Sequence, residues 1–210
     1  IALSGVIEAN EKIGHKNVDK IFIDIANIFT AHAKNFKNFI FARMIGTEFS
    51  VLLLVFSDEN GDYPAGTYLR HPPGSYHAPY SKNGCVIFVK LDHFHPDDLS
   101  TVVIRTDVKE WRQGNGNLKV LPLHDHLYEH TALVKWPRLE RFHPHTHWGG
   151  EEIFVLDGVF EDEQGRYGRN TWLRNPNHSE HNPFSLEGSL IYVKVGHLLQ
   201  SLSGTSHDDR

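Results

Sequence analysis

Short apolar runs, each of the length of a β-strand, recur along the chain between clusters of turn-forming residues. The runs are rich in β-branched and aromatic residues and include 21–23, 39–41, 51–56 and 153–156. The turn clusters include 58–62, 71–74 and 82–84. Short strands punctuated in this way predict an all-β sandwich or barrel. Helical periodicity is weak, and residues 28–39 are the best candidate for a helix.

The chain contains an internal repeat of about a hundred residues, far longer than the units of a solenoid. When residues 58–94 are aligned with 162–198 at an offset of 104 without gaps, 17 of the 37 positions are identical. The identities include Asp-Glu-x-Gly-x-Tyr, Leu-Arg-x-Pro, Ser-x-His and Val-Lys. We therefore predict two copies of one domain, an N-terminal domain at 1–100 and a C-terminal domain at 101–210.

A cluster of potential metal ligands lies in the C-terminal copy. His145, His147 and Glu151 stand at i, i+2 and i+6, so one extended strand would project all three side chains from the same face. Asp157-Gly158 is a turn signal at the end of this strand. His181 follows a proline turn at Pro176. Three imidazoles and one carboxylate suit a divalent first-row metal, whereas an incidental polar strand face is the alternative.

These residues carry a resemblance to a known family. His145-x-His147-x-x-x-Glu151, followed by Gly158, resembles the first motif of the cupin superfamily, and Pro176 with His181 resembles the second. The run from His147 to Phe160, H-W-G-G-E-E-I-F-V-L-D-G-V-F, is similar to the ChrR-type cupins. The resemblance implies two tandem cupin barrels, each a double-stranded β-helix or jelly roll. It also implies one divalent metal in the C-terminal domain, with zinc expected first and iron, manganese or nickel as alternatives.

The N-terminal copy lacks most of these ligands. At the same offset, His145, His147 and Glu151 correspond to Phe41, Arg43 and Thr47, and only His181 keeps its counterpart, His77. A single histidine does not hold a transition metal. We therefore expect a degenerate site without a metal, in a structural domain or around an apolar pocket for a small ligand.

Other residues near the motif have weaker assignments. Trp148 is expected near the mouth of the barrel and Glu152 outside the ligand set. Tyr167 and Arg174 have counterparts in the other copy, Tyr63 and Arg70, which favours a role in folding over one in catalysis. A second H-x-H pair, His124 and His126, lacks a suitably placed carboxylate and is interpreted as exposed edge-strand or turn residues.

Composition and charge restrict the partners. The chain has a net charge of −5 and no basic cluster, which argues against nucleic acid. No apolar run is long enough to span a membrane, and the first residues do not resemble a signal peptide, so we expect a cytoplasmic protein. Its single cysteine, Cys85, excludes an intrachain disulfide and a multi-thiolate zinc site. A homodimer is expected because cupin sheets commonly pair at their edges.

Two classes of function fit these observations. The first is a regulatory, sensing or stress-related module that resembles the cupin part of the zinc-dependent anti-sigma factor ChrR. That resemblance implies a sigma factor as partner, although the first predicted strand begins at Ile21 and leaves no room for the N-terminal zinc-binding domain of such proteins. The second is a metal-dependent dioxygenase of the acetylacetone-cleaving type, with the four ligands as its only assigned residues. A structural protein with an adventitious metal is the remaining alternative.

Overall fold

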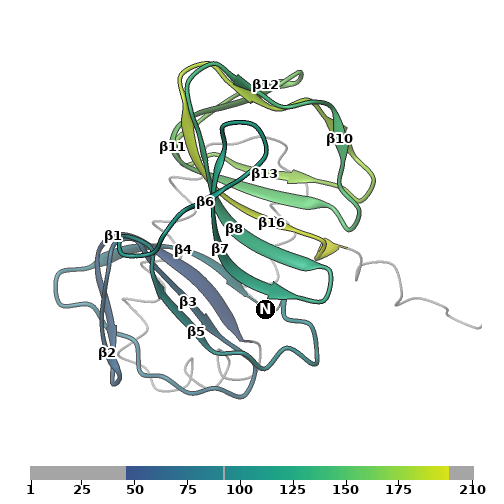
Figure 1. Cartoon of the computed structure of the whole chain (residues 1–210). Helices are drawn as coiled ribbons and strands as arrows, with labels where there is room; N and C mark the ends of the chain where they lie inside the picture. Colours follow the sequence, from purple (N-terminus) through teal and green to yellow (C-terminus); the bar gives the residue numbers. More distant parts are fainter. Residues whose placement is uncertain (1–45, 92, 199–210) are drawn as a thin grey trace, which may run out of the picture. The chain divides into compact units, whose positions relative to one another are not determined.

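The computed structural model describes residues 46–91 and 93–198, and the regular elements of these residues are all β-strands (Figure 1). The all-β fold class is therefore confirmed. The strands form two compact units, each with a curled sheet. The N-terminal unit contains described residues 46–91, 93–114 and 119–133, and the C-terminal unit contains 115–118 and 134–198. The strands expected at 21–23 and 39–41 and the helix at 28–39 lie outside the described residues.

The N-terminal unit is built around one long strand, β1. Its sheet runs in the order β2-β1-β3-β5, and β4 also pairs with β1; β6 pairs with β7 in the same unit. These pairings are all antiparallel. The strands are β1 (Thr47–Asp58), β2 (Gly61–Pro64), β3 (Thr67–His71), β4 (Cys85–Leu91), β5 (Val102–Arg105), β6 (Arg112–Gln113) and β7 (Lys119–His126).

The C-terminal unit is built around β11 in the same way. β11 pairs with β16, β12, β13 and β15, and a separate small sheet joins β10 to β14. The strand β8 (Glu129–Trp136) passes from the N-terminal unit into this one at Val134. The remaining strands are β9 (Glu140–Arg141), β10 (His145–Thr146), β11 (Glu151–Asp162), β12 (Gly165–Gly168), β13 (Trp172–Asn175), β14 (Glu180–His181), β15 (Phe184–Ser185) and β16 (Ser189–Val195).

The two long strands are structural copies of each other. Both β1 and β11 have 12 residues and begin with five consecutive buried residues. Each carries a β-bulge at the same repeat position, between Val51 and Leu53 in β1 and between Val155 and Asp157 in β11. The repeat found in the sequence is therefore also a repeat in space. The compact units differ from the predicted domains 1–100 and 101–210 in that 101–114 and 119–133 lie in the N-terminal unit.

Equivalent residues of the repeat fill the two cores. The N-terminal core contains Phe49, Val51, Phe56, Leu69 and Ile87. The counterparts of these residues, Ile153, Val155, Phe160, Leu173 and Ile191, are all part of the C-terminal core. Apolar side chains at the same strand positions thus give each unit its own hydrophobic centre, which is what burial of one sheet face requires.

Asp157-Gly158 does not end a strand, contrary to the turn predicted there. β11 continues through these residues to Asp162. Gly158 has a φ of +71°, and a Cβ atom at this position would overlap the carbonyl oxygen of Gly188. The glycine therefore serves a β-bulge that bends the strand, since a bulge also calls for a positive φ and close backbone approach.

Candidate functional site

The three motif residues His145, His147 and Glu151 do not lie on a single extended strand, and that prediction is wrong. His145 is in β10, Trp148 and Gly149 form a turn, and Glu151 begins β11. Gly149 and Gly150 have φ values of +77° and +71°. A Cβ atom on Gly149 would lie 2.6 Å from the Cα of Gly196. The two glycines thus let the chain turn tightly, and the turn brings the ligands together where strand alternation alone would not.

Strand pairing supplies the fourth residue. β10 pairs with β14, and His145 stands directly opposite His181 in this pair. The loop before β14 is also fixed to the motif, because the amide of His147 donates to the carbonyl of Ser179 and the amide of His178 donates to the carbonyl of His147. The proline turn therefore returns His181 to the first motif, as expected from the sequence.

The four side chains converge on a small volume. The Nε2 atoms of His147 and His181 are 2.9 Å apart. The Oε2 atom of Glu151 lies 3.4 Å from Nε2 of His147 and 3.5 Å from Nε2 of His181. The imidazole rings of His145 and His147 have centroids 4.5 Å apart. One ring nitrogen from each of the three histidines falls within 4.8 Å of the others, a separation at which they could hold a metal ion.

Neighbouring groups orient two of these side chains. The Nδ1 atom of His145 lies 3.1 Å from the carbonyl oxygen of His143. Because a carbonyl only accepts hydrogen bonds, Nδ1 carries the proton and Nε2 keeps its lone pair. The Nδ2 group of Asn175 donates to Oε2 of Glu151 at 2.9 Å, and Asn175 stands opposite Glu151 across the β11–β13 pair. Such supporting hydrogen bonds are common around metal ligands.

The buried site strongly perturbs its ionisable groups. Burial raises the pKa of Glu151 to about 7, although the hydrogen bond from Asn175 opposes this. Burial, together with the charges of His145 and His181, lowers the pKa of His147 to about 4. The pKa of His181 is also lowered, mainly by burial. At neutral pH these two imidazoles are thus neutral, the form in which histidine ligates a metal. The donor set, neutral nitrogens beside a buried carboxylate, fits a divalent first-row ion.

The residues around this cluster divide into exposed and structural ones. Trp148 is 54% exposed, in keeping with a position at the mouth. Tyr167 donates to Oδ1 of Asp162 at 2.8 Å, and its counterpart Tyr63 donates to Oδ1 of Asp58 at 3.0 Å. Glu152 contacts Nε2 of His197 at 2.9 Å and lies 3.8 Å from Nε of Arg174. These contacts favour folding roles for both tyrosines and for Glu152.

The corresponding place in the N-terminal unit has different residues. Phe41 and Arg43 lie outside the described residues. Thr47, which replaces Glu151, is buried, and His71 stands opposite it across the β1–β3 pair, where Asn175 stands in the other unit. His77, the counterpart of His181, is near His71 and Asp58, and a nitrogen of each imidazole and a carboxylate oxygen of Asp58 lie within 4.8 Å of one another. This grouping was missed from the sequence, and the one signal for it in the repeat is that His71 stands where the other copy has Asn175.

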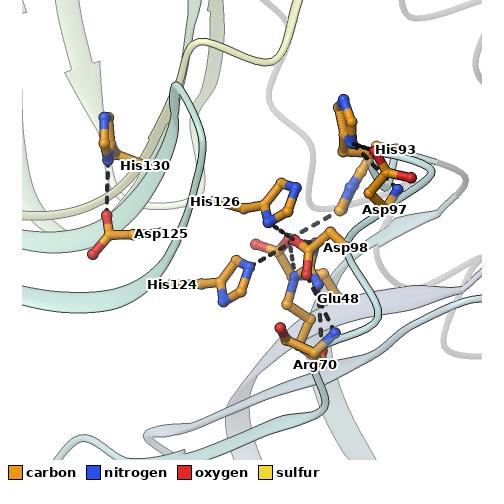
Figure 2. A network of polar contacts seen from close by, with 11 residues as sticks. Glu48, Arg70, His93, Asp97, Asp98, His124, Asp125, His126 and His130 are labelled. Carbon is orange, nitrogen blue, oxygen red and sulfur yellow. Dashed lines mark hydrogen bonds and ion pairs between the residues drawn. The ribbon is translucent and has the colours of Figure 1, made fainter.

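A second polar network in the N-terminal unit surrounds Asp98 (Figure 2). Arg70 reaches Oδ2 of Asp98 at 2.8 Å and lies 3.7 Å from Glu48, and His124 contacts Asp98 at 2.7 Å. Burial raises the pKa of Asp98, but the hydrogen bonds from His124 and Ser100 and the charge of Arg70 outweigh it and lower the pKa. His124 is therefore not an exposed edge residue, contrary to the interpretation above. Its ring joins a buried ion pair because β7 passes next to Asp98.

The fold and the histidine-rich motif define a cupin, and comparisons with known proteins support this class. The sequence profile of the ChrR cupin-like domain matches residues 44–95 and 99–199, more than half of the chain. The chain therefore belongs to the ChrR cupin-like domain family. No curated protein matches its sequence.

Two of the matched solved structures show the same fold. A candidate dioxygenase from Nostoc punctiforme matches with a TM-score of 0.62 and 15% identity, over 76% of this chain and 64% of that one. A cupin 2 conserved barrel domain protein from Leptotrichia buccalis matches with a TM-score of 0.52 and 13% identity, over 71% and 73%. The Rhodobacter sphaeroides complex of SigE with the anti-sigma ChrR matches at 24% identity and a TM-score of 0.39, over 43% and 51%. The chain thus spans about half of the matched chain in that complex.

Among residues 46–91 and 93–198, no helix has the length and hydrophobicity that a lipid bilayer crossing requires.

Proposed function

We propose that the C-terminal unit is a metal centre, in which His145, His147, Glu151 and His181 bind one divalent first-row ion. The observation that carries this proposal is the convergence of Glu151 Oε2 on two histidine Nε2 atoms at 3.4 and 3.5 Å. A buried carboxylate is costly unless a positive charge compensates it, and the two imidazoles beside it are neutral. A divalent ion would supply that charge and would use the lone pairs that face it.

The role that fits this centre best is regulatory or sensing, with zinc as the expected metal. Membership of the ChrR cupin-like family supports it, as does the way the metal ligands connect separate elements. His145 and His181 come from β10 and β14, and Glu151 comes from β11. A bound ion would therefore link three strands, so gain or loss of the ion would change the stability of the unit. A sigma factor is the partner that this role suggests; a homodimer and a cytoplasmic location stay predictions.

A dioxygenase activity on a small organic substrate is the second candidate function. The observation that favours it is the partial exposure of His145 and the exposure of Trp148, which leave one side of the cluster accessible. In this case iron bound by the four side chains would supply the redox chemistry. Asn175 would hold Glu151 in place, and the His143 carbonyl would keep the lone pair of His145 directed at the ion.

Metal analysis of the purified protein distinguishes these functions. Protein prepared without added metal is analysed by elemental mass spectrometry beside a His145→Ala/His147→Ala variant. We expect zinc in the wild type. The variant should contain about one ion per chain less and should have a lower melting temperature than the wild type. Iron in the wild type, with oxygen consumption on addition of acetylacetone, would favour the dioxygenase. An unchanged metal content and melting temperature in a folded variant would contradict the metal centre.

A further inference from the structure

The N-terminal unit contains a group of buried polar atoms without the partners that buried groups require. Asp58 lies at the end of β1, His71 at the end of β3, and His77 in the segment between β3 and β4. Within the described residues, no hydrogen-bond partner exists for Asp58 Oδ2, His71 Nε2 or His77 Nδ1, although all three atoms are buried. An unsatisfied buried polar atom costs about 1–3 kcal/mol, so three in one place call for an explanation.

The three side chains lie close to one another. The Nδ1 atom of His77 is 3.6 Å from Oδ2 of Asp58, which is too long for a hydrogen bond. The rings of His71 and His77 have centroids 4.3 Å apart. One ring nitrogen of each histidine and one carboxylate oxygen of Asp58 lie within 4.8 Å of each other. A metal ion with bonds of about 2.1 Å separates its ligand atoms by about 3 to 3.5 Å, so small side-chain rotations would close the set around an ion.

We propose that Asp58, His71 and His77 form a second metal site, a two-histidine, one-carboxylate centre for a divalent first-row ion in the N-terminal unit. Such a set leaves coordination positions open, and iron(II), zinc and related ions use it. The motif that defines the C-terminal centre is absent here. Only His77 is shared with it through the repeat, and the carboxylate comes from the other end of the long strand.

Neighbouring residues orient Asp58 and His71, and burial keeps both histidines neutral. The Oδ1 atom of Asp58 accepts hydrogen bonds from the Asn60 amide at 2.7 Å and the Tyr63 hydroxyl at 3.0 Å. These bonds fix the carboxylate and leave Oδ2 for an ion. His71 stacks on Phe49, with ring centroids 6.0 Å apart. Burial lowers the pKa of His71 to about 4 and also lowers that of His77, so both imidazoles keep lone pairs at neutral pH.

Comparison of the two copies of the repeat shows which residues differ at this place, and it provides a variant for the test. In the C-terminal unit, the position of His71 is taken by Asn175, which contacts Glu151. The position of Glu151 is taken by Thr47, whose hydroxyl oxygen is also buried without a partner in the described residues. One copy thus has a carboxylate opposite an amide, and the other has a hydroxyl opposite an imidazole. The change His71→Asn restores a residue that the same fold already accommodates at this place.

The test counts zinc in protein that lacks the C-terminal centre. Metal-free wild type, the His145→Ala/His147→Ala variant, and that variant with His71→Asn or Asp58→Asn added are dialysed against excess Zn²⁺ and analysed by elemental mass spectrometry. We expect about two ions per chain in the wild type, about one in the first variant and fewer than about 0.2 in both others. A further His130→Asn change, at an exposed histidine of the same unit, is the matched control and should leave about one ion.

Two outcomes would overturn the second site. One is a folded His145→Ala/His147→Ala variant that binds no zinc. The other is an ion in this variant that survives both His71→Asn and Asp58→Asn. Failure of the C-terminal centre would look different, because the wild type would then bind only about one ion and the His145→Ala/His147→Ala variant would bind as much as the wild type. Circular dichroism of each variant verifies folding, and a zinc-dependent rise in melting temperature that disappears with His71→Asn gives a second readout.

Discussion

The two halves of the repeat keep the same framework but place different chemistry in it. β1 and β11 have equal lengths, the same bulge and equivalent core residues. At the paired positions that face the site, however, Thr47 and His71 stand in one copy, and Glu151 and Asn175 in the other. The framework depends on backbone geometry and on burial, which tolerate little change. The side chains at the ligand positions differ between the two copies without changing this framework.

A buried ion-pair group recurs on the other side of both long strands. In the N-terminal unit Glu48 lies 3.7 Å from Arg70 and 3.2 Å from His93. In the C-terminal unit Glu152 lies 3.8 Å from Arg174 and 2.9 Å from His197. All three residue types are retained at the offset of 104. This group belongs to the framework, which is why its histidines and glutamates do not add to either proposed centre.

The largest loss of stability is expected when Arg70 is replaced, and a much smaller loss when Arg174 is replaced. Arg70 is fully buried, whereas the side chain of Arg174 is 34% exposed. Arg70→Met would leave Asp98 and Glu48 buried without their cation, which we expect to cost about 3–5 kcal/mol of stability. Arg174→Met should cost about 1 kcal/mol or less, because solvent screens its ion pair. Urea unfolding followed by circular dichroism measures both, and equal losses would contradict the distinction.

We expect the second-largest loss of stability when Gly158, at the bulge of β11, is replaced. Gly158→Ala would place a Cβ atom against the backbone at Gly188 and would force a residue with a side chain to keep a φ of +71°. We expect a loss of at least about 2 kcal/mol. Gly168→Ala is the control, because a Cβ atom there would meet nothing within 4 Å. If the two variants unfold at the same urea concentration, the bulge does not depend on glycine.

The pH dependence of metal-free protein sharpens the difference between Glu151 and Thr47. Because the pKa of Glu151 is raised to about 7 in the folded state, this group favours folding at low pH and loses that contribution as pH rises through 7. Glu151→Gln removes the buried charge. It should therefore stabilise metal-free protein by about 1–3 kcal/mol at pH 8 and have little effect at pH 4.

Thermal unfolding with a chelator present, at both pH values, measures this effect. In zinc-loaded protein the same change should instead lower the melting temperature, because a ligand is lost. A stabilisation of equal size at pH 4 and pH 8 would mean that Glu151 does not titrate as described. Thr47→Val serves as the comparison in the other copy, since threonine has no charge to titrate and its effect should not change with pH.

The sequence predicted the framework better than the sites. Apolar runs and the ungapped repeat were sufficient for the all-β class and for the equivalence of the two copies, because burial on one sheet face leaves a periodic trace. The return of His181 to the first motif was expected from the proline turn at Pro176 and from the resemblance to the cupin motifs. The turn at Trp148–Gly149 did not, since alternation along a strand says nothing about where the strand stops. The grouping of Asp58, His71 and His77 depends on strand register across β1 and β3, which a single sequence does not encode locally.

The smallest change in stability is expected at the bulge of β1, at the residue that corresponds to Gly158. This residue is Leu54, which has a φ of +60° although it carries a side chain. A leucine at positive φ costs about 1–2 kcal/mol of conformational energy. Because the side chain is 56% exposed, its burial offsets little of that cost. Leu54→Gly would relieve the strain but would add about 0.5–1 kcal/mol of unfolded-state entropy. We therefore expect a net stabilisation of up to about 1 kcal/mol.

Two comparisons decide whether the backbone is the cause. Leu54→Asn keeps a side chain that tolerates a positive φ and should stabilise the protein in the same direction. Leu53→Gly removes a neighbouring exposed leucine with no positive φ and should destabilise it. A loss of stability in both Leu54 variants, measured by urea unfolding, would show that the Leu54 side chain contributes more than its backbone costs. The same bulge would then be maintained by backbone freedom in β11 and by side-chain contacts in β1.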